Sequence, residues 1–372
     1  MRVVVVDPPA YTPPYDRSLA AALARAGADV ELVTSAFAWG SVPAPDGYTV
    51  REDFYSRSTK LPPDSRRRRL VKAMEHPGDM RGYRATAADA DVVHFQWLTF
   101  PGLDARLLPS DRPLVQTPHG LLRAEAWDDR RAGAWRRLLG RMDAVVALSG
   151  YGAEVLRSKA GVPTERVHVI PHGPLDYLAR MPDEAPLPPD LAAVDGPVVL
   201  YFGLIRPYKG VDVLLEAFRE VEGAELWVVG RPFGVDFSEL AELAGRARAT
   251  VRLIPRFVDD REVAAYFRRP DLVALPHRDA EQSGALFTAL AFGKAVVMSD
   301  VGGFGEVSAL GAGRLVDPGD PAALAAAIGE LLDDADARAE LEAGARAAAE
   351  GPYAWDQIAA QTIALYEDLR RE

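Results

Sequence analysis

The feature that most constrains the fold is an alternation of short apolar runs with stretches of helical period, which starts twice along the chain. Residues 3–6 open the first series and residues 198–202 open the second. Apolar runs that alternate with helices are typical of parallel strands buried on both faces, so the pattern predicts βαβ units. With 372 residues the chain has material for two such series, each with its own core. We therefore predict an α/β protein with two doubly wound domains that face a cleft.

Changes in composition place the predicted domain boundaries. Residues 1–175 form an N-terminal Rossmann-like domain, and residues 176–196 are rich in proline and acidic residues, which is typical of a linker. Residues 197–352 form a second Rossmann-like domain. Residues 353–372 carry a helical pattern after a Gly-Pro pair, so we expect this last helix to pack back on the first domain.

Composition and charge exclude several classes of protein. The 43 basic and 54 acidic side chains give a net charge of −11, and such a field disfavours a nucleic-acid partner. There is no cysteine, which excludes disulfides, thiolate metal sites and a cysteine nucleophile. The first apolar run is too short for a signal peptide and no later run has the length of a membrane span, so we expect a cytoplasmic protein.

The loop after the first strand of each series bears on nucleotide binding. Asp7 leads into residues 8–14, which contain no glycine, so the glycine fingerprint of nicotinamide enzymes is missing. The equivalent turn of the second series, residues 203–210, begins and ends with glycine and contains Arg206 and Lys209. Two cations at this spacing can converge on a phosphate group or straddle two. The alternative is that both are ordinary solvated charges.

A second anion site is predicted where residues 279–284 lead into an apolar helix. Ser283 is the predicted N-cap, and the free amides and dipole of a helix start attract an anion, with Gly284 allowing close approach. Glu281 repels phosphate but suits sugar hydroxyls, so an acid beside an amide cradle indicates a sugar next to a phosphate. Alternatively, Glu281 interacts only with the helix dipole. The glycine-rich turn 301–306 can present further amides.

Polar and aromatic residues near the strand ends of the first domain suggest contacts to a sugar. His119 and His172 each stand between Pro and Gly after an apolar run, where each either points into the cleft or only satisfies a turn. An aromatic side chain with polar neighbours suits a sugar face. Candidates for contacts to an acceptor are Tyr11, Tyr15, His94, Gln96 and Trp97.

The motifs of the second domain resemble those of a known family. GLIRPYKGVDVLLEAF, EQSGALFTALAFGKAVVMSDVGGFGEV and the terminal YAWDQIAAQTIALYEDL resemble the nucleotide-binding half of GT-B glycosyltransferases, specifically the retaining glycosyltransferase family 4 group. TPHG and ALSGYGAEVL resemble the first half more loosely. The resemblance implies transfer of a sugar from a nucleoside-diphosphate sugar, UDP being the first candidate, to a hydroxyl of a glycan, lipid-linked or small-molecule acceptor. It also implies retention at the anomeric carbon, with no metal or other cofactor.

The resemblance implies roles for individual residues. Arg206 and Lys209 match the pair that grips the donor diphosphate, Glu281 the acid near the donor sugar hydroxyls, and His119 the histidine beside the donor sugar. These four are the candidate catalytic residues. Further candidates for donor binding are Gly203, Gly230, Arg231, Gln282, Ser283, Gly284, Ala285 and Thr288.

Two departures from the family pattern affect these assignments. The loop after the first strand carries Pro8-Pro9 where the family usually has a glycine pair. The family also usually has two glutamates with seven residues between them, the second bonding the ribose, whereas here Thr288 takes the second position with six residues between it and Glu281. The usual spacing would select Ala280, and we assign Glu281 because it is the only glutamate in the loop. The Thr288 hydroxyl either bonds the ribose or turns back to the carbonyl of Gly284.

Other functions stay open at this point. One is a nucleotide-sugar epimerase or an inverting GT-B transferase with Asp16 or Glu125 as base, and another is a non-catalytic sugar-nucleotide-binding partner. A run of basic residues also has no assigned role. It either attracts an anionic acceptor or the membrane surface, or it is simply a solvated helix face or a mobile loop. Its members are Arg66, Arg67, Arg68, Arg69 and Lys72.

Overall fold

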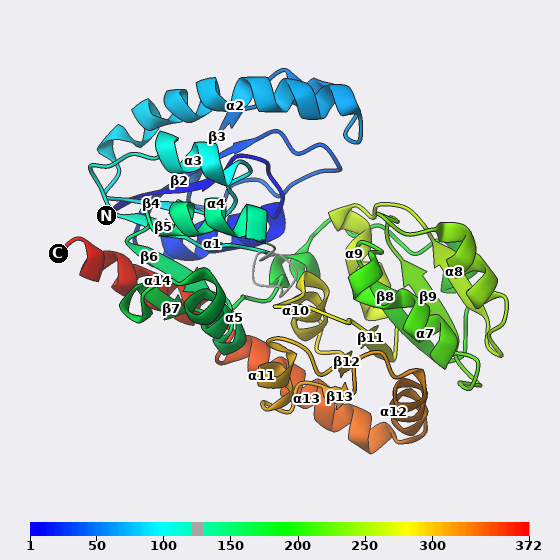
Figure 1. The fold of residues 1–372 in the computed structure, drawn as a ribbon. Coiled ribbons are helices and arrows are strands. Elements are labelled where there is room, and N and C mark those ends of the chain that lie inside the picture. The colour runs from blue at the N-terminus through cyan, green and yellow to red at the C-terminus, as the bar shows by residue number, and fades with distance from the viewer. Residues whose placement is uncertain (121–128, 372) are drawn as a thin grey trace. The chain divides into compact units, whose positions relative to one another are not determined.

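A computed structural model of the chain describes residues 1–120 and 129–371. The chain divides into two compact units (Figure 1). Unit 1 is Met1–Gly173 together with Trp355–Glu372, and unit 2 is Pro174–Ala354. Each unit is built on one parallel sheet between two layers of helices, which confirms the predicted α/β class with two Rossmann-like domains.

The sheet of unit 1 has seven parallel strands in the order β3-β2-β1-β4-β5-β6-β7. They are β1 (Arg2–Asp7), β2 (Asp29–Ser35), β3 (Thr49–Phe54), β4 (Val92–Phe95), β5 (Leu114–Gln116), β6 (Ala144–Ala147) and β7 (Val167–Val169). The apolar runs predicted as strands are buried, as crossover helices on both faces require. The edge strand β3 is mostly exposed and polar, so its sequence contains no strand signal.

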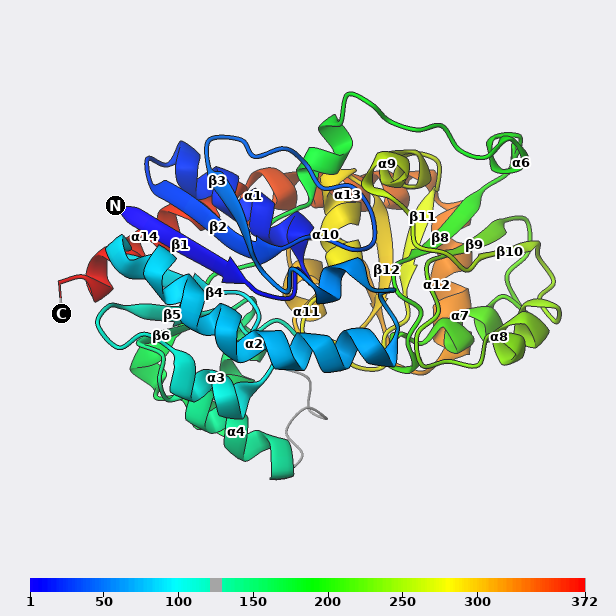
Figure 2. The ribbon, with the colours of Figure 1, turned by 90° about the horizontal axis from the view of Figure 1, so that it is seen from above.

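Helices cover both faces of this sheet (Figure 2). Val4 and Phe95 face one layer, and Val3 and Val5 face the other. The first layer consists of α2 (Arg66–Thr86), α3 (Pro101–Leu107), α4 (Asp129–Leu139) and α5 (Gly150–Val155), which continues into the π-helical turn η4 (Leu156–Ala160). The second consists of α1 (Pro13–Arg25) and the C-terminal helix α14 (Trp355–Leu369). Short 3-10 turns are η1 (Ser58–Lys60), η2 (Ala87–Asp89) and η5 (Thr164–Arg166).

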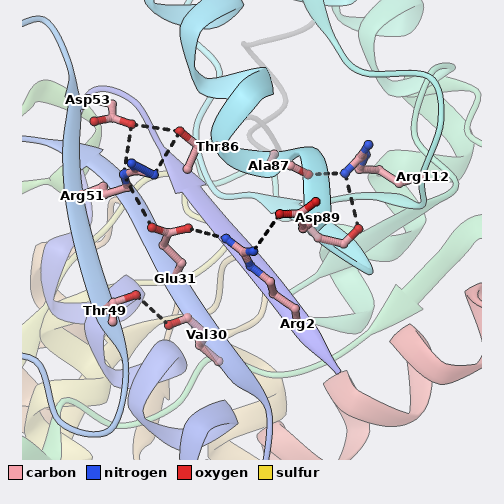
Figure 3. A network of polar contacts seen from close by, with 11 residues as sticks. Arg2, Val30, Glu31, Thr49, Arg51, Asp53, Thr86, Ala87, Asp89 and Arg112 are labelled. Carbon is pink, nitrogen blue, oxygen red and sulfur yellow. Dashed lines mark hydrogen bonds and ion pairs between the residues drawn. The ribbon is translucent and has the colours of Figure 1, made fainter.

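A polar network runs across the first three strands of unit 1 (Figure 3). Arg2 pairs with Glu31 at 3.2 Å and with Asp89 at 3.5 Å, while Arg51 pairs with Glu31 at 3.6 Å and with Asp53 at 3.5 Å. Several of these side chains are exposed to solvent, and an exposed ion pair contributes at most about 1 kcal/mol. The network adds polar contacts between β2 and the edge strand β3, whose side chains are mostly exposed apart from the buried Phe54.

Unit 2 has a six-stranded sheet in the order β10-β9-β8-β11-β12-β13. The strands are β8 (Val198–Phe202), β9 (Glu225–Val229), β10 (Val251–Ile254), β11 (Leu272–Leu275), β12 (Ala295–Ser299) and β13 (Arg314–Val316). One face packs on α7 (Val211–Ala217), α8 (Phe237–Ala244) and α12 (Pro321–Asp333). The other packs on α9 (Asp260–Arg268), α10 (Gly284–Ala291), α11 (Phe304–Ser308) and α13 (Ala335–Glu350).

The segment 176–196, expected to be a linker, packs within unit 2. Leu178 and Leu191 are buried in its core, on the short elements η6 (Asp176–Arg180) and α6 (Pro189–Ala192). Its proline-rich composition sets an irregular path along the unit rather than a free connection. Among the described residues, no helix is long and apolar enough to cross a membrane.

In both sheets the order of the strands reverses next to the first strand: early strands are added on one side of it and later strands on the other. In unit 1 this point lies between β1 and β4, and in unit 2 between β8 and β11. Open α/β sheets bind ligands outside the carboxyl ends of the strands at such a switch point. The predicted anion loops, residues 203–210 and 279–284, follow β8 and β11 and therefore flank the switch point of unit 2.

Candidate functional site

The backbone of the turn after β8 crosses the backbone that follows β9 at two glycines, Gly203 and Gly230, which lie in close contact. Gly203 has φ +121° and Gly230, after β9, has φ +151°, which favours glycine at both positions. A Cβ on Gly230 would overlap the carbonyl oxygen of Gly203. A Cβ on Gly203 would lie 3.5 Å from Nζ of Lys209, so this ammonium group reaches back over the crossing.

Three cations gather at this crossing. The guanidinium carbons of Arg206 and Arg231 lie 4.8 Å and 5.8 Å from the ring centroid of Phe233, whose side chain is 48% exposed. Cation–π contacts with one ring hold both guanidinium groups beside each other. With Lys209, they concentrate positive charge where a multiply charged anion such as a diphosphate can make charge-assisted hydrogen bonds.

The loop after β11 is held by the turn after β12. Gly302 has φ +54°, and a Cβ there would overlap the carbonyl oxygen of Ala280. The amide of Gly303 donates to the carbonyl of Glu281 at 2.9 Å. The two turns are therefore joined through their backbones, and the buried Glu281 lies at the start of α10.

The start of α10 lacks the side-chain cap that the sequence predicts. Ser283 stands at the N-cap, but its hydroxyl bonds no amide of the helix and is buried with no hydrogen-bond partner among residues 1–120 and 129–371. A Cβ on Gly284 would meet nothing within 4 Å, so there is open space beside the first turn, next to Gln282 and Ala285. The hydroxyl and the unpaired amides of this turn suit an anionic ligand.

Thr288 takes the second of the two conformations considered for it. Its hydroxyl donates to the carbonyl of Gly284 at 2.8 Å, and its side chain is only 3% exposed. This back-bond is the usual resting state of a threonine inside a helix. Thr288 does not present its hydroxyl toward a ribose in this conformation.

We therefore expect Thr288→Val to change nucleoside-diphosphate affinity by less than about 1.5 kcal/mol, because the lost hydroxyl bonds only the helix backbone. Titration calorimetry measures the change, and Thr288→Ser, which keeps the hydroxyl, is the matched control. Loss of binding in Thr288→Val but not in Thr288→Ser would show that Thr288 substitutes for the missing acid.

In unit 1 the structure brings four of the predicted residues together. His119 Nε2 lies 2.9 Å from Oε1 of Gln96, and its ring stacks on Trp97 with centroids 5.8 Å apart. The ring of Tyr15 meets His119 edge-on at 4.8 Å. Burial, with the neighbouring His172, lowers the pKa of His119 well below its usual value. His119 is therefore neutral at physiological pH, which suits contact to a sugar rather than uptake of a proton.

His94, predicted to contact an acceptor, is a core residue. Its ring nitrogens hydrogen-bond Tyr366 at 2.6 Å and Thr117 at 2.8 Å, and burial lowers its pKa to about 3. His94 lies within β4 and points toward α14, whereas Gln96 and Trp97 follow the end of the strand. Tyr15 is also buried, whereas Tyr11 is exposed and meets the Trp97 ring edge-on at 5.3 Å.

A pair of buried acids, Asp7 and Asp16, supports the loop after β1 and was not predicted as a pair. Asp7 accepts the amide of Tyr11 at 2.8 Å, and Asp16 accepts the hydroxyl of Thr12 at 3.3 Å. Burial raises the pKa of Asp7 to about 6, and burial with the nearby Asp7 raises that of Asp16 well above its usual value. Asp16 is thus buried beside Asp7 and is not presented to an acceptor as a base. The other base considered, Glu125, lies outside the described residues.

The basic run begins helix α2, which shows that the mobile-loop alternative is wrong. Arg66, Arg67 and Arg69 are exposed, and Arg68 is partly covered. Lys72 turns inward, and its Nζ lies 4.7 Å from the ring centroids of both Tyr11 and Tyr55. Burial lowers the pKa of Lys72 to about 8. The run therefore divides into an exposed cationic face and one lysine that packs against the loop after β1, a division that residue spacing alone does not show.

The fold and the site define a two-domain Rossmann-like protein with a cluster of cations at the switch point of its second sheet. Two family models match it: residues 16–173 match Glycosyltransferase Family 4, and residues 196–334 match Glycosyl transferases group 1. The D-inositol 3-phosphate glycosyltransferase of Xylanimonas cellulosilytica is 31% identical over 95% of this chain and 90% of its own. The phosphatidyl-myo-inositol mannosyltransferase of Mycolicibacterium smegmatis is 31% identical over 76% of this chain and 72% of its own.

The same fold recurs among solved structures. HepE of Anabaena, solved with UDP and glucose, has a TM-score of 0.73 at 20% identity and covers 99% of this chain and 100% of its own. The chain belongs to the family 4 glycosyltransferases, enzymes of the GT-B fold.

Proposed function

We propose that the protein moves a sugar from a nucleoside-diphosphate sugar to an acceptor hydroxyl, with retention of configuration and without a metal. The cluster of Arg206, Lys209 and Arg231 at the switch point of unit 2 carries this proposal. Departure of the nucleoside diphosphate leaves negative charge on its oxygen, and cations already in place stabilise that charge without reorganising. A divalent ion performs this work in other transferases.

Other residues of the site fit sugar and nucleotide contacts. Glu281, held at the start of α10, is placed to accept hydrogen bonds from donor sugar hydroxyls. The neutral His119 offers a sugar contact without acting as a base, and the burial of Asp16 argues against an inverting mechanism that uses it. UDP is the first nucleotide to test, because HepE of the same fold was solved with UDP.

The test is product analysis in the presence of EDTA. A thermal-shift series with UDP, GDP and ADP selects the nucleotide. The matching nucleotide sugar is incubated with D-inositol 3-phosphate and, separately, with phosphatidyl-myo-inositol, the acceptors that the names of the two curated relatives suggest. We expect nucleotide release only when an acceptor is present and a product whose anomeric NMR signal keeps the donor configuration. An inverted product contradicts retention, an epimerised donor supports the epimerase, and binding without turnover supports the non-catalytic partner.

We also propose that the exposed face of α2 contacts an anionic membrane or a lipid-linked acceptor. Leu70 is 67% exposed and Met74 is 80% exposed on the same helix as the exposed arginines. Apolar side chains beside cations are typical of helices that lie in a membrane interface. On this proposal the protein is a peripheral enzyme at the membrane surface.

Replacing Arg66, Arg67 and Arg69 by alanine should weaken binding to vesicles with phosphatidylglycerol by roughly 100-fold, at about 1 kcal/mol for each cation. Flotation at low salt measures the bound fraction, with phosphatidylcholine vesicles as the reference. The control removes the same charge from unit 2, at the exposed Arg219, Arg246 and Arg248. Equal loss in both variants, or no binding by the wild type, contradicts the membrane contact.

A further inference from the structure

His277 is a buried histidine that the proposed mechanism does not use. Its side chain is 1% exposed, and among the described residues neither ring nitrogen has a partner at hydrogen-bonding geometry. The backbone of Leu275 is the polar group that acts on the ring from nearby. The buried histidines of unit 1 differ, since His94 and His119 are hydrogen-bonded. A neutral imidazole always carries one N–H, and an unpaired buried polar group is costly and requires an explanation.

The position of His277 links it to the diphosphate site. It follows β11, and the backbone on either side of it is fastened to the turn after β8. A Cβ on Gly210 would overlap the carbonyl oxygen of Pro276, and the amide of Arg278 donates to the carbonyl of Tyr208 at 2.7 Å. His277 therefore lies beneath the turn that carries Arg206 and Lys209.

The groups around the His277 ring explain why the ring is uncharged. Tyr208, on η7 (Pro207–Lys209), meets it edge-on at 6.4 Å, and the apolar ring of Phe304, at the start of α11, does so at 5.3 Å. Burial and the ammonium group of Lys209 outweigh the nearby backbone of Leu275 and hold the pKa of His277 well below its usual value, so the ring is neutral. A diphosphate bound at Lys209 reverses the sign of the local field and favours the protonated ring.

We propose that His277 is a further donor-binding residue, which donates a ring N–H to the phosphate oxygens of the nucleoside-diphosphate sugar, directly or through one water. A proton from the solvent joins the second ring nitrogen as the donor binds, so that the imidazolium and Lys209 hold the diphosphate together. This inference rests on the proposed function of the same site. It deepens that function by giving the buried histidine a role in donor recognition.

The experiment counts protons taken up on binding. UDP-glucose and GDP-mannose carry no phosphate group that titrates near neutral pH, so a proton gained at pH 7.5 belongs to the protein. Calorimetric titrations in buffers of different ionisation enthalpy give the number of protons from the slope of binding enthalpy. We expect uptake by the wild type, no uptake by His277→Gln, and about tenfold or greater weakening in that variant. His168→Gln, a half-buried histidine on β7 of unit 1, is the matched control and should leave both values unchanged.

Each outcome decides the inference. If His277→Gln binds the nucleotide sugar with the same affinity and the same proton uptake as the wild type, the inference is overturned and the proposed function stays intact. If the wild type binds neither nucleotide sugar, both are overturned. If His277→Gln does not fold, the wild type alone supplies the answer. His277 is the one histidine in residues 174–354, and its imidazole nitrogen NMR signals should move to the charged form when the nucleotide sugar is added. Signals that stay at the neutral form overturn the proposal.

Discussion

Arg206→Ala and Lys209→Ala should each lower kcat by roughly 10² to 10³, because each removes a cation that stabilises charge formed chiefly in the transition state. KM for the nucleotide sugar should rise less, since part of each contact is absent in the ground state. Steady-state kinetics with the donor and acceptor found by product analysis measures both constants. Arg219→Ala, an exposed arginine of the same unit, is the control and should have wild-type rates.

Near wild-type turnover in Arg206→Ala or Lys209→Ala would refute the cation cluster as the leaving-group site. The wild type should also keep its activity in EDTA, because in the proposed mechanism these cations take the place of a divalent ion. Activity abolished by the chelator and restored by Mg²⁺ or Mn²⁺ contradicts the metal-free mechanism, whatever the two variants do.

Gly302→Ala should lower the free energy of unfolding of unit 2 by about 2 to 5 kcal/mol and abolish nucleotide binding. A left-handed φ costs alanine about 1 to 2 kcal/mol, and the overlap with the carbonyl oxygen of Ala280 adds an overpacking cost of about 1 to 3 kcal/mol. The overlap also separates the turn after β12 from the loop that holds Glu281. Chemical denaturation and nucleotide titration measure the two effects.

Gly311→Ala provides the matched control for this variant. Gly311 has φ +72°, close to the +54° of Gly302, but a Cβ there would meet nothing within 4 Å. Its alanine variant should lose only the backbone cost of about 1 to 2 kcal/mol and should keep nucleotide binding. Equal stability and equal binding in the two variants would contradict the close contact between the two turns.

Much of the fold is predictable from apolar runs alone. Strands such as β1 and β8 are buried on both faces, so their sequences are continuously apolar and identify them without ambiguity. The edge strand β3 was missed because exposure leaves it free to be polar. Segment 176–196 shows the opposite error, since proline-rich composition predicts irregular backbone but says nothing of burial, and Leu191 anchors the segment in a core.

The parts of the candidate site that lie within one loop were predictable from the sequence. The flanking glycines and the two cations of turn 203–210 can be recognised from their spacing in the sequence. Arg231 lies far from them along the chain and comes close to the two cations because β9 lies beside β8. His94 was misplaced because it lies inside β4 and bonds Tyr366 of α14, while its neighbours Gln96 and Trp97 lie past the strand end. Thr288 was left open because a single side-chain rotamer decides whether its hydroxyl bonds a ligand or the helix backbone. Asp7 and Asp16 pair through the fold, and His277 differs from other buried histidines only in what surrounds it.

Calorimetric titration with UDP, GDP and ADP, in EDTA, tests the central claim most directly, because it asks whether the cation cluster of unit 2 binds a nucleoside diphosphate without a metal. We expect one of the three to bind at a single site, and Arg206→Ala to weaken that binding by about tenfold or more, as the loss of a charge-assisted contact predicts. Binding by none of the three nucleotides, or binding that appears only when a divalent ion is added, would contradict the account.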